Sequence, residues 1–390
     1  MKKLADRMVR IPPSGTIMMA EIARKMEREG RKIYHLEVGE PDFDTPEHIK
    51  QAAYKAIKEG FTHYTSSRGI PELREAVAEY LKNRRNVDAD PEKEILITPG
   101  TKHAIYCCCQ ATIDEGDEVL VLSPIWTTFF AAVKAAGGKP IEVPTDENYD
   151  VDEENLKGLI SEKTKMIVIN SPNNPTGGVA GEDTLKLLRD LAVERDLLVL
   201  SDEIYERFLY DGVESPSIAS FDGMKERTIV VNGWSKAYAM TGWRLGYAVA
   251  EKSIIDAMLK IQQMTTTCPS SFVQKAGLEA YRGPQECVEE MVKEYDKRRK
   301  AIVDRLNSIN GVKCPTPKGA FYVFPDFTSF KEPSNKIVEK LLMSKGVCAT
   351  PGTAFGEKGE GHIRFSYATS LNVINEAMDL LAEFVEEELT

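Results

Sequence analysis

The sequence lacks the features that mark several large protein classes. Its 390 residues include only seven cysteines, with no Cys-x-x-Cys pair, so neither a disulfide framework nor a cysteine-based zinc site is expected. No apolar run approaches the ~20 residues needed to cross a bilayer. Residues 1–3, Met-Lys-Lys, are not followed by an apolar segment, so an export signal is not expected. These absences favour a cytoplasmic protein with reduced thiols.

Excess basic charge is also missing. The chain has 50 Lys and Arg against 61 Asp and Glu, and its net charge of −11 disfavours nucleic acids and anionic membranes as partners. The five histidines show no metal-ligand spacing with each other or with cysteine, so no metal site is expected. No Gly-x-Gly-x-x-Gly follows a strand and no Gly-Lys-Ser/Thr occurs, which argues against a nucleotide-dependent oxidoreductase.

The middle of the chain alternates short aliphatic runs with stretches of helical periodicity. This pattern predicts an α/β fold whose mostly parallel sheet is sandwiched by helices. Two domains are expected at this length: a large one at residues 46–288, and a smaller α/β one formed by residues 1–45 and 289–390. The predicted strands are residues 95–98, 119–122, 166–170, 197–201, 228–231 and 245–250. The predicted helices include residues 102–112, 183–194, 287–306 and 373–389.

Unusual segments follow four of the predicted strands, where an open parallel sheet binds its ligands. After the first strand, Gly100 precedes a helix that begins with Thr101 and Lys102. Glycine lets the backbone approach a ligand, and the free N–H groups of a helix start suit a phosphate. A plain turn is the alternative interpretation of this segment.

The second and third segments contribute polar side chains. Asn173 and Asn174 stand between two prolines, which constrains the loop more than a tight turn requires. Asp202 ends an apolar strand and is followed by Tyr205, so a carboxylate is placed at the rim of a buried sheet. Such a charge needs a cationic partner or a ligand, although Asp202 could equally cap a helix.

The fourth segment carries a lysine in unusual surroundings. Lys236 lies among glycine, serine, alanine and aromatic residues, with no charged residue before Arg244. Burial and a nearby cation would lower the pKa of the amine and make it a nucleophile. A phosphate site, a carboxylate, a tyrosine and a desolvated lysine at one sheet edge match the needs of pyridoxal phosphate.

In combination these motifs resemble the class I aminotransferases, the large group of fold type I pyridoxal-phosphate enzymes that includes aspartate aminotransferase. The resemblance covers nearly the whole chain, from residues 36–43 to residues 361–366. Asn-Asn-Pro-Thr-Gly, Ser-Asp-Glu-x-Tyr and Ser-Lys-x-x-x-Met-Thr-Gly-Trp-Arg-x-Gly occur in order at family-like spacing.

The resemblance implies roles for the residues around the cofactor. Lys236 would join the cofactor aldehyde and then move the substrate proton, and Asp202 would pair with the pyridine nitrogen. Tyr205 and Asn174 would bind the ring hydroxyl. The phosphate would be held by the turn at Gly100, by the backbone of Thr101 and Lys102, and by Ser235 and Arg244.

Further roles concern the substrate and a second subunit. Trp126 would stack on the cofactor ring, and Tyr64 would reach the phosphate of the neighbouring subunit in a homodimer with shared active sites. Arg364 would grip the α-carboxylate of an amino acid or 2-oxo acid, with help from Gly39, Trp126 and Asn174.

The chain departs from some relatives at two positions. Gly233 stands where some members carry a phosphate-binding serine, so one phosphate contact is expected to be missing or supplied by water. Arg68 stands where relatives commonly have small residues. One hypothesis is that Arg68 helps to recognise a distal carboxylate, and the alternative is that it is a surface arginine.

The resemblance predicts amino transfer between aspartate and 2-oxoglutarate in a ping-pong cycle. Aromatic or alanine amino transfer, carbon–sulfur lyase or cyclopropane-forming chemistry, and a catalytically idle regulator are the alternatives.

Overall fold

A seven-stranded sheet forms the centre of the computed structural model, which describes residues 5, 7–11 and 15–389. Residues 1–3, considered above as the start of an export signal, lie outside the described residues. Across the sheet the strands are β2 (Ile95–Thr98), β8 (Gly246–Val249), β7 (Thr228–Gly233), β6 (Leu198–Asp202), β5 (Thr164–Asn170), β3 (Glu118–Ser123) and β4 (Lys139–Pro144).

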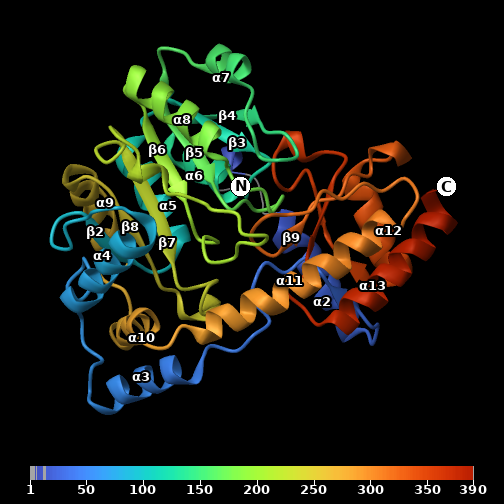
Figure 1. Ribbon diagram of the computed structural model, residues 1–390, viewed down its shortest axis with the longest axis horizontal. Coiled ribbons are helices and arrows are strands. Elements are labelled where there is room, and N and C mark those ends of the chain that lie inside the picture. Colours follow the sequence, from blue (N-terminus) through green and yellow to red (C-terminus); the bar gives the residue numbers. More distant parts are fainter. Residues whose placement is uncertain (1–4, 6, 12–14, 390) are drawn as a thin grey trace.

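All neighbouring strands of this sheet are parallel except at β8, which runs antiparallel to both β2 and β7. Because β2 and β7 both run against β8, they share one direction. The carboxyl ends of β2, β3, β5, β6 and β7 therefore meet at the same edge, and Figure 1 shows this edge facing the C-terminal third of the chain. The predicted mostly parallel α/β sheet is confirmed.

Apart from the edge strand β4, the strands are mostly buried on both faces, which explains their near-continuous apolar sequences. On β5, Met166 and Val168 pack with α5 (Thr101–Thr112), α6 (Thr128–Ala136) and α9 (Lys252–Thr265). Their neighbours Ile167 and Ile169 pack on the other face with α8 (Glu182–Glu194). Cys107, Cys108 and Cys109 of α5 are fully buried, so they fill the core.

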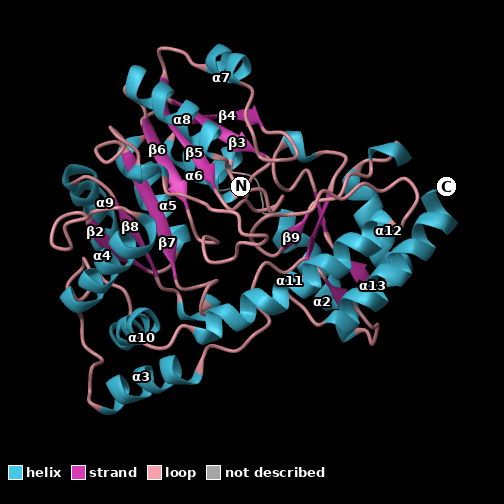
Figure 2. Cartoon of the chain, viewed as in Figure 1, coloured by secondary structure: helices cyan, strands magenta, loops and turns pink. Residues whose placement is uncertain are grey.

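The remaining strands are short and lie outside the main sheet. Near the start of the chain, β1 (Tyr34–His35) pairs in parallel with β10 (Val347–Cys348). A second small sheet has the order β11 (Thr350–Pro351), β12 (Ile363–Ser366) and β9 (Tyr322–Val323). Helix α11 (Glu286–Asn307) runs from beside the main sheet to these elements (Figure 2). The β1–β10 pair joins residues 34–35 to residues 347–348, and the predicted division at residues 46–288 against 1–45 and 289–390 stays a prediction.

The other helices complete the covering layers. The α-helices are α1 (Arg7–Arg10), α2 (Gly15–Arg28), α3 (Glu47–Lys58), α4 (Pro71–Arg85), α7 (Glu153–Leu159), α10 (Ser271–Arg282), α12 (Ser334–Lys345) and α13 (Leu371–Phe384). The 3-10 turns are η1 (Ile218–Ser220), η2 (Thr241–Trp243), η3 (Thr328–Phe330) and η4 (Glu357–Gly359); η5 (Val385–Leu389) is a π-helical turn. Within the described ranges, no helix is long and apolar enough to cross a membrane.

All six predicted strands are confirmed to within two residues at either end. Strand β4 was not predicted, because two prolines and two charged residues interrupt it (Lys139-Pro140-Ile141-Glu142-Val143-Pro144). Proline is tolerated here because β4 lies at the sheet edge.

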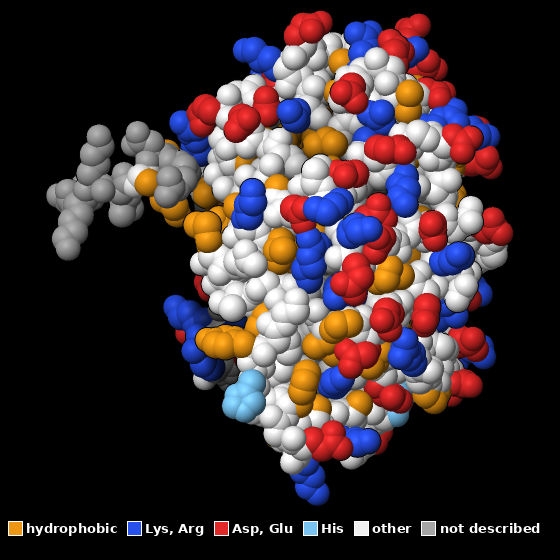
Figure 3. Space-filling view, turned by 90° about the vertical axis from the view of Figure 1, so that its left-hand side faces the viewer, with side chains coloured by type: hydrophobic (Ala, Val, Ile, Leu, Met, Phe, Trp, Pro, Cys, Tyr) orange, Lys and Arg blue, Asp and Glu red, His pale blue; other side chains and the backbone are white. Residues whose placement is uncertain are grey.

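Figure 3 shows acidic and basic side chains interspersed over the face that it presents.

Candidate active site

Most residues singled out in the sequence gather at the carboxyl-end edge of the main sheet. They come from the ends of five different strands or from the segments beside them, so the fold brings together residues far apart in the chain. Gly100, Thr101 and Lys102 follow β2; Trp126 follows β3; Asn174 follows β5; Asp202 and Tyr205 come from the end of β6; Ser235 and Lys236 follow β7; and Arg244 precedes β8.

The amine of Lys236 is desolvated. Burial lowers its pKa to about 8, and the positive charges of Arg364 and Arg244 act in the same direction, whereas Glu40 and Asp202 oppose them. The Nζ donates a hydrogen bond to the backbone carbonyl of Gly39. At pH 7 roughly a tenth of this amine is therefore unprotonated and nucleophilic, far more than at its ordinary pKa of 10.5.

Asp202 is a buried carboxylate that lacks a bonded cation among the described residues. Its side chain is 2% exposed, and Oδ1 accepts a hydrogen bond from the Ile204 amide at 3.1 Å. Burial raises the pKa of Asp202 to about 7. A cationic ligand group beside Asp202 would favour its ionised form, as the nitrogen of a protonated pyridine ring would do.

Tyr205 is paired with a residue that the sequence reasoning missed. The hydroxyl oxygens of Tyr205 and Tyr322 lie 2.7 Å apart, and both side chains are buried. Tyr322 comes from the two-residue strand β9, too short to be recognised by periodicity. Tyr322 also lies against Gly39, where an added Cβ would stand 2.7 Å from the tyrosine hydroxyl oxygen.

Arg364 is a buried cation held only by neutral groups in the described structure. Nη1 donates to Asn174 Oδ1 at 3.0 Å, Nη2 donates to the Glu37 carbonyl and to Thr350 Oγ1, and buried Nε has no partner. The rings of Tyr322 and Phe355 lie 4.6 and 4.9 Å from the guanidinium carbon. Burial lowers the pKa of Arg364. A buried guanidinium without an anion is a ready receptor for a carboxylate.

The turn before α5 forms a compact cradle beside Arg244. Gly100 has φ 85°, and an added Cβ there would collide with the Arg244 guanidinium. A Cβ on Gly246 would lie 2.6 Å from the Thr101 amide, and a Cβ on Gly233 would lie 2.7 Å from the Gly246 Cα. Gly233, noted above as a departure from some relatives, therefore permits the close packing of β7 against β8. The first N–H groups of α5 have no intrahelical acceptor and suit an anion.

Lys102 and Trp126 are brought into contact at this edge. The Lys102 amine lies 4.7 Å from the Trp126 ring centroid, which is a cation–π distance. Burial lowers the pKa of Lys102, and the nearby charge of Arg244 adds to this effect. The side chain of Lys102 thus packs on the indole, while its backbone stays at the helix start.

Two of the singled-out residues do not join this cluster. Tyr64 is 86% exposed, so its expected role in a neighbouring subunit stays a prediction. Arg68 forms an ion pair with Asp256 and donates to the Lys93 carbonyl at 3.1 Å. The structure therefore supports a structural role for Arg68 and not the recognition of a distal carboxylate.

The described residues fit the cofactor that the sequence suggested. A helix start with Arg244 suits its phosphate, Asp202 suits its ring nitrogen, Tyr205 suits its ring hydroxyl, and the Lys236 amine suits its aldehyde. Within the described residues, no group of three or more histidine, cysteine or acidic side chains is arranged to hold a metal ion.

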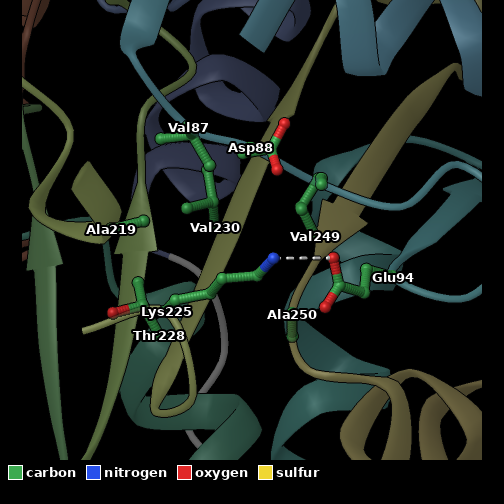
Figure 4. A pocket seen from close by; sticks show the side chains of 10 residues that line it. Val87, Asp88, Glu94, Ala219, Lys225, Thr228, Val230, Val249 and Ala250 are labelled. Carbon is green, nitrogen blue, oxygen red and sulfur yellow. Dashed lines mark ion pairs between the residues drawn. The ribbon is translucent and has the colours of Figure 1, made fainter. Parts of the chain in front are cut away.

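A separate hollow lies at the opposite end of the strands (Figure 4). Its volume is about 40 Å³, and its lining includes Val87, Val230 and Val249 near the Lys225–Glu94 ion pair of 3.3 Å. A cavity of this size accommodates one or two water molecules. It is too small for the cofactor and plays no part in the site.

Comparison with known proteins gives concordant results over almost the full length. A family model described as aminotransferase class I and II matches residues 31–381. The chain is 46% identical to an aspartate aminotransferase of Pyrococcus abyssi and 44% identical to aromatic-amino-acid aminotransferase 2 of Thermococcus litoralis, with 98% of each chain covered. The solved structure of the aspartate aminotransferase of Thermus thermophilus with maleate is similar, with a TM-score of 0.93 and 41% identity. That match covers 98% of this chain and 100% of the other.

Proposed function

The chain belongs to the class I and II aminotransferases, which use pyridoxal 5'-phosphate, and on this premise we propose that it exchanges amino groups between aspartate and 2-oxoglutarate. The exchange proceeds by a ping-pong cycle, in which one 2-oxo acid leaves before the second enters. Relatives of 40–46% identity that carry the name aspartate aminotransferase support this choice of substrates.

Different residues at the sheet edge would hold different groups of the cofactor. Lys236 would hold its aldehyde, Asp202 its ring nitrogen, and Tyr205 its ring hydroxyl. Asn174 assists Tyr205, and Trp126 covers the ring. The phosphate would lie on the turn at Gly100, Thr101 and Lys102, with Ser235 and Arg244 as further partners. When bound, the cofactor supplies an electron sink for the pair released from the substrate Cα–H bond.

Lys236 moves the proton in both half-reactions. Its desolvated amine, with a pKa of about 8, takes the proton from Cα of the amino acid in the first half-reaction and gives a proton to Cα of the newly formed amino acid in the second. The Gly39 carbonyl holds the amine in place between these steps. Glu40 and Asp202 raise the pKa of Lys236, so the amine can also hold a proton near neutral pH.

The pairing of Lys236 and Arg364 with one short segment carries this proposal. The amine donates to the carbonyl of Gly39, and the guanidinium donates to the carbonyl of Glu37, two residues earlier. A substrate whose α-carboxylate is bound by Arg364 thus has its α-carbon on the side of the site that residues 37–39 and the Lys236 amine form. Fixing the carboxylate also fixes which bond at Cα is broken, which favours proton removal over decarboxylation.

Borohydride reduction of the purified, cofactor-loaded protein followed by peptide mapping tests the cofactor assignment. The label is expected on Lys236, and a label on any other residue contradicts it. A panel of amino donors with 2-oxoglutarate then tests the substrates, with aspartate expected to give the highest kcat/KM. Release of pyruvate and ammonia without an acceptor would indicate a carbon–sulfur lyase instead.

Aromatic amino acids are the second candidate donors. The 44% identity to the aromatic-amino-acid aminotransferase of Thermococcus litoralis supports them, as do the buried rings of Tyr322 and Phe355 beside Arg364. Alanine is a further alternative. The same donor panel separates these candidates by their kcat/KM values.

A homodimer with shared sites is part of the proposal. Tyr64 is 86% exposed, and the exposed apolar side chains Tyr54, Ile57 and Met264 are typical of surfaces that are covered by a partner. Mixing inactive Lys236→Ala subunits with Tyr64→Ala subunits is expected to restore sites that carry both native residues. Activity that never exceeds the sum of the separate variants would contradict site sharing.

The remaining assignments concern organisation and location. We propose the domain division at residues 46–288 against residues 1–45 and 289–390, which the β1–β10 pair supports. We also propose a cytoplasmic location, supported by seven free cysteines in the structure.

A further inference from the structure

A loop from the C-terminal third of the chain reaches the edge of the main sheet and carries Phe355. This side chain is fully buried, and its ring lies 4.9 Å from the guanidinium carbon of Arg364. The carbonyl of Phe355 accepts a hydrogen bond from the Ile125 amide at 2.9 Å. Because Ile125 directly precedes Trp126, one loop residue contacts both the carboxylate receptor and the segment that covers the cofactor.

Glu142 on edge strand β4 binds the residues that follow Phe355. Its Oε1 accepts a hydrogen bond from the Glu357 amide at 2.9 Å, and its Oε2 accepts from the Lys358 amide at 3.3 Å and from Ser123 Oγ at 2.6 Å. The two amides belong to η4, whose first N–H groups have no partner within the turn. Glu142 therefore joins the main sheet to the loop through charge-assisted hydrogen bonds.

Gly356 permits this close contact. It has φ 111°, a conformation that residues with a side chain rarely adopt. An added Cβ would lie 2.5 Å from Glu142 Oε2 and 2.8 Å from Ser123 Oγ. The backbone of the loop thus lies directly against the Glu142 carboxylate, and there is no room for a side chain at position 356.

We propose that Glu142 is a positioning residue for the binding of the substrate α-carboxylate. It holds residues 355–358 on the sheet edge, and Phe355 in turn keeps the Arg364 guanidinium between its own ring and that of Tyr322. The arginine side chain that carries the guanidinium is long and flexible, so loss of one flanking ring lets the guanidinium leave the orientation that binds a carboxylate. This inference rests on the proposed function in taking Arg364 as the carboxylate receptor.

Two substitutions at one position test the kinetic consequence. Glu142→Ala removes all three hydrogen bonds, and we expect the KM of both the amino acid and the 2-oxo acid to rise about tenfold, with kcat changed less than about twofold. Both KM values rise because Arg364 receives both carboxylates. Glu142→Gln keeps one oxygen, which can still accept from the Glu357 amide, and its NH2 group can donate to Ser123 Oγ, but it no longer accepts from the Lys358 amide. It is therefore expected to restore both KM values in large part.

Hydrogen exchange in the cofactor-free protein provides a readout that is independent of activity. The amides of Glu357 and Lys358 are expected to exchange faster in Glu142→Ala than in the native protein. In Glu142→Gln the Glu357 amide should exchange near the native rate, whereas the Lys358 amide should exchange faster. Glu118→Ala is the matched control, because Glu118 begins the adjacent strand β3 and accepts from Lys139 and Ser161 away from the loop. This control should leave the KM values and the exchange of both amides unchanged.

Two results would overturn the inference. Unchanged exchange in Glu142→Ala would mean that the carboxylate does not hold the loop. Faster exchange with unchanged KM values would mean that the loop does not position Arg364. A failure of the proposed function is distinguishable, because it shows in the native protein as an absence of amino transfer.

Discussion

Tyr205 and Tyr322 share a hydrogen bond of 2.7 Å between their hydroxyl groups, although 117 residues separate them in the chain. Tyr205 follows strand β6 of the main sheet, and Tyr322 lies on β9 of the small sheet. The pair therefore joins the two parts of the structure at the site itself. It also fixes the orientation of the Tyr205 hydroxyl before any ligand binds.

Replacing Tyr322 by Phe removes this partner and leaves the Tyr205 hydroxyl buried without it. We expect a loss of about 1–2 kcal/mol in the free energy of unfolding, from urea denaturation, and a fall of about tenfold in kcat/KM. Tyr367→Phe is the matched control, because the Tyr367 hydroxyl donates to the Ala320 carbonyl at 3.1 Å, outside the site. The control should lose stability with little change in kcat/KM; equal kinetic losses in the two variants would contradict a specific role for Tyr322.

Cofactor loading should depend on pH through Lys236. Burial lowers the pKa of this amine to about 8, and only the neutral amine reacts with an aldehyde. The loading rate of cofactor-free protein is expected to rise about tenfold per pH unit below pH 8 and to level off above it. Stopped-flow absorbance after mixing measures this rate. Lys236→Ala should bind without covalent attachment and show no turnover; a flat rate from pH 6 to 9 would contradict the lowered pKa.

The stability of the cofactor-free protein should depend on pH through Asp202. Burial raises its pKa from 3.8 to about 7, so between these values the native state holds a proton that the unfolded state has released. The contribution of Asp202 to stability is therefore present below pH 4 and is lost as pH rises to 7, by roughly 4 kcal/mol at most. Asp202→Asn should remove this part of the pH dependence in urea unfolding. An identical dependence in both proteins would refute the assignment.

Arg364 should cost stability in the absence of substrate. Its charge is buried among neutral acceptors, so Arg364→Leu is expected to raise the unfolding midpoint of the cofactor-free protein while abolishing carboxylate binding. Arg299→Leu is the contrasting variant, since Arg299 is equally buried but pairs with Asp211 and Asp296 at 2.8 and 2.6 Å. That variant should be strongly destabilised. A lower midpoint for Arg364→Leu would argue against a site held ready at the expense of stability.

Six strands of the main sheet could be predicted because each of them has a local signature. Runs such as Ile95-Leu96-Ile97-Thr98 are buried on both faces, so their sequences are apolar throughout, and the turns after them contain the glycines and asparagines of the site. Strand β4 escaped prediction because an edge strand need not be apolar. Its Glu142 faces a loop from the other end of the chain, a relation that no local pattern encodes.

The part of the site around Arg364 depends on contacts between segments that are distant in the sequence. Tyr322, Phe355 and Thr350 surround Arg364, yet they come from two-residue strands and a loop whose own sequences carry no periodic signal. Arg68 is the opposite case. Its position in the sequence suggested that it belongs to the site, but it forms an ion pair with Asp256 of α9 instead. Partners of this kind become visible only in three dimensions.

The parallel pairing of β1 with β10 ties Tyr34 to Val347, so the first and last parts of the chain interlock. The carbonyls of Glu37 and Gly39, which hold the guanidinium and the amine, follow directly on β1. During synthesis these carbonyls cannot reach their final places until residues beyond 364 have left the ribosome. A growing chain can thus complete its central sheet, whose last strand ends at Val249, well before it is able to turn over substrate.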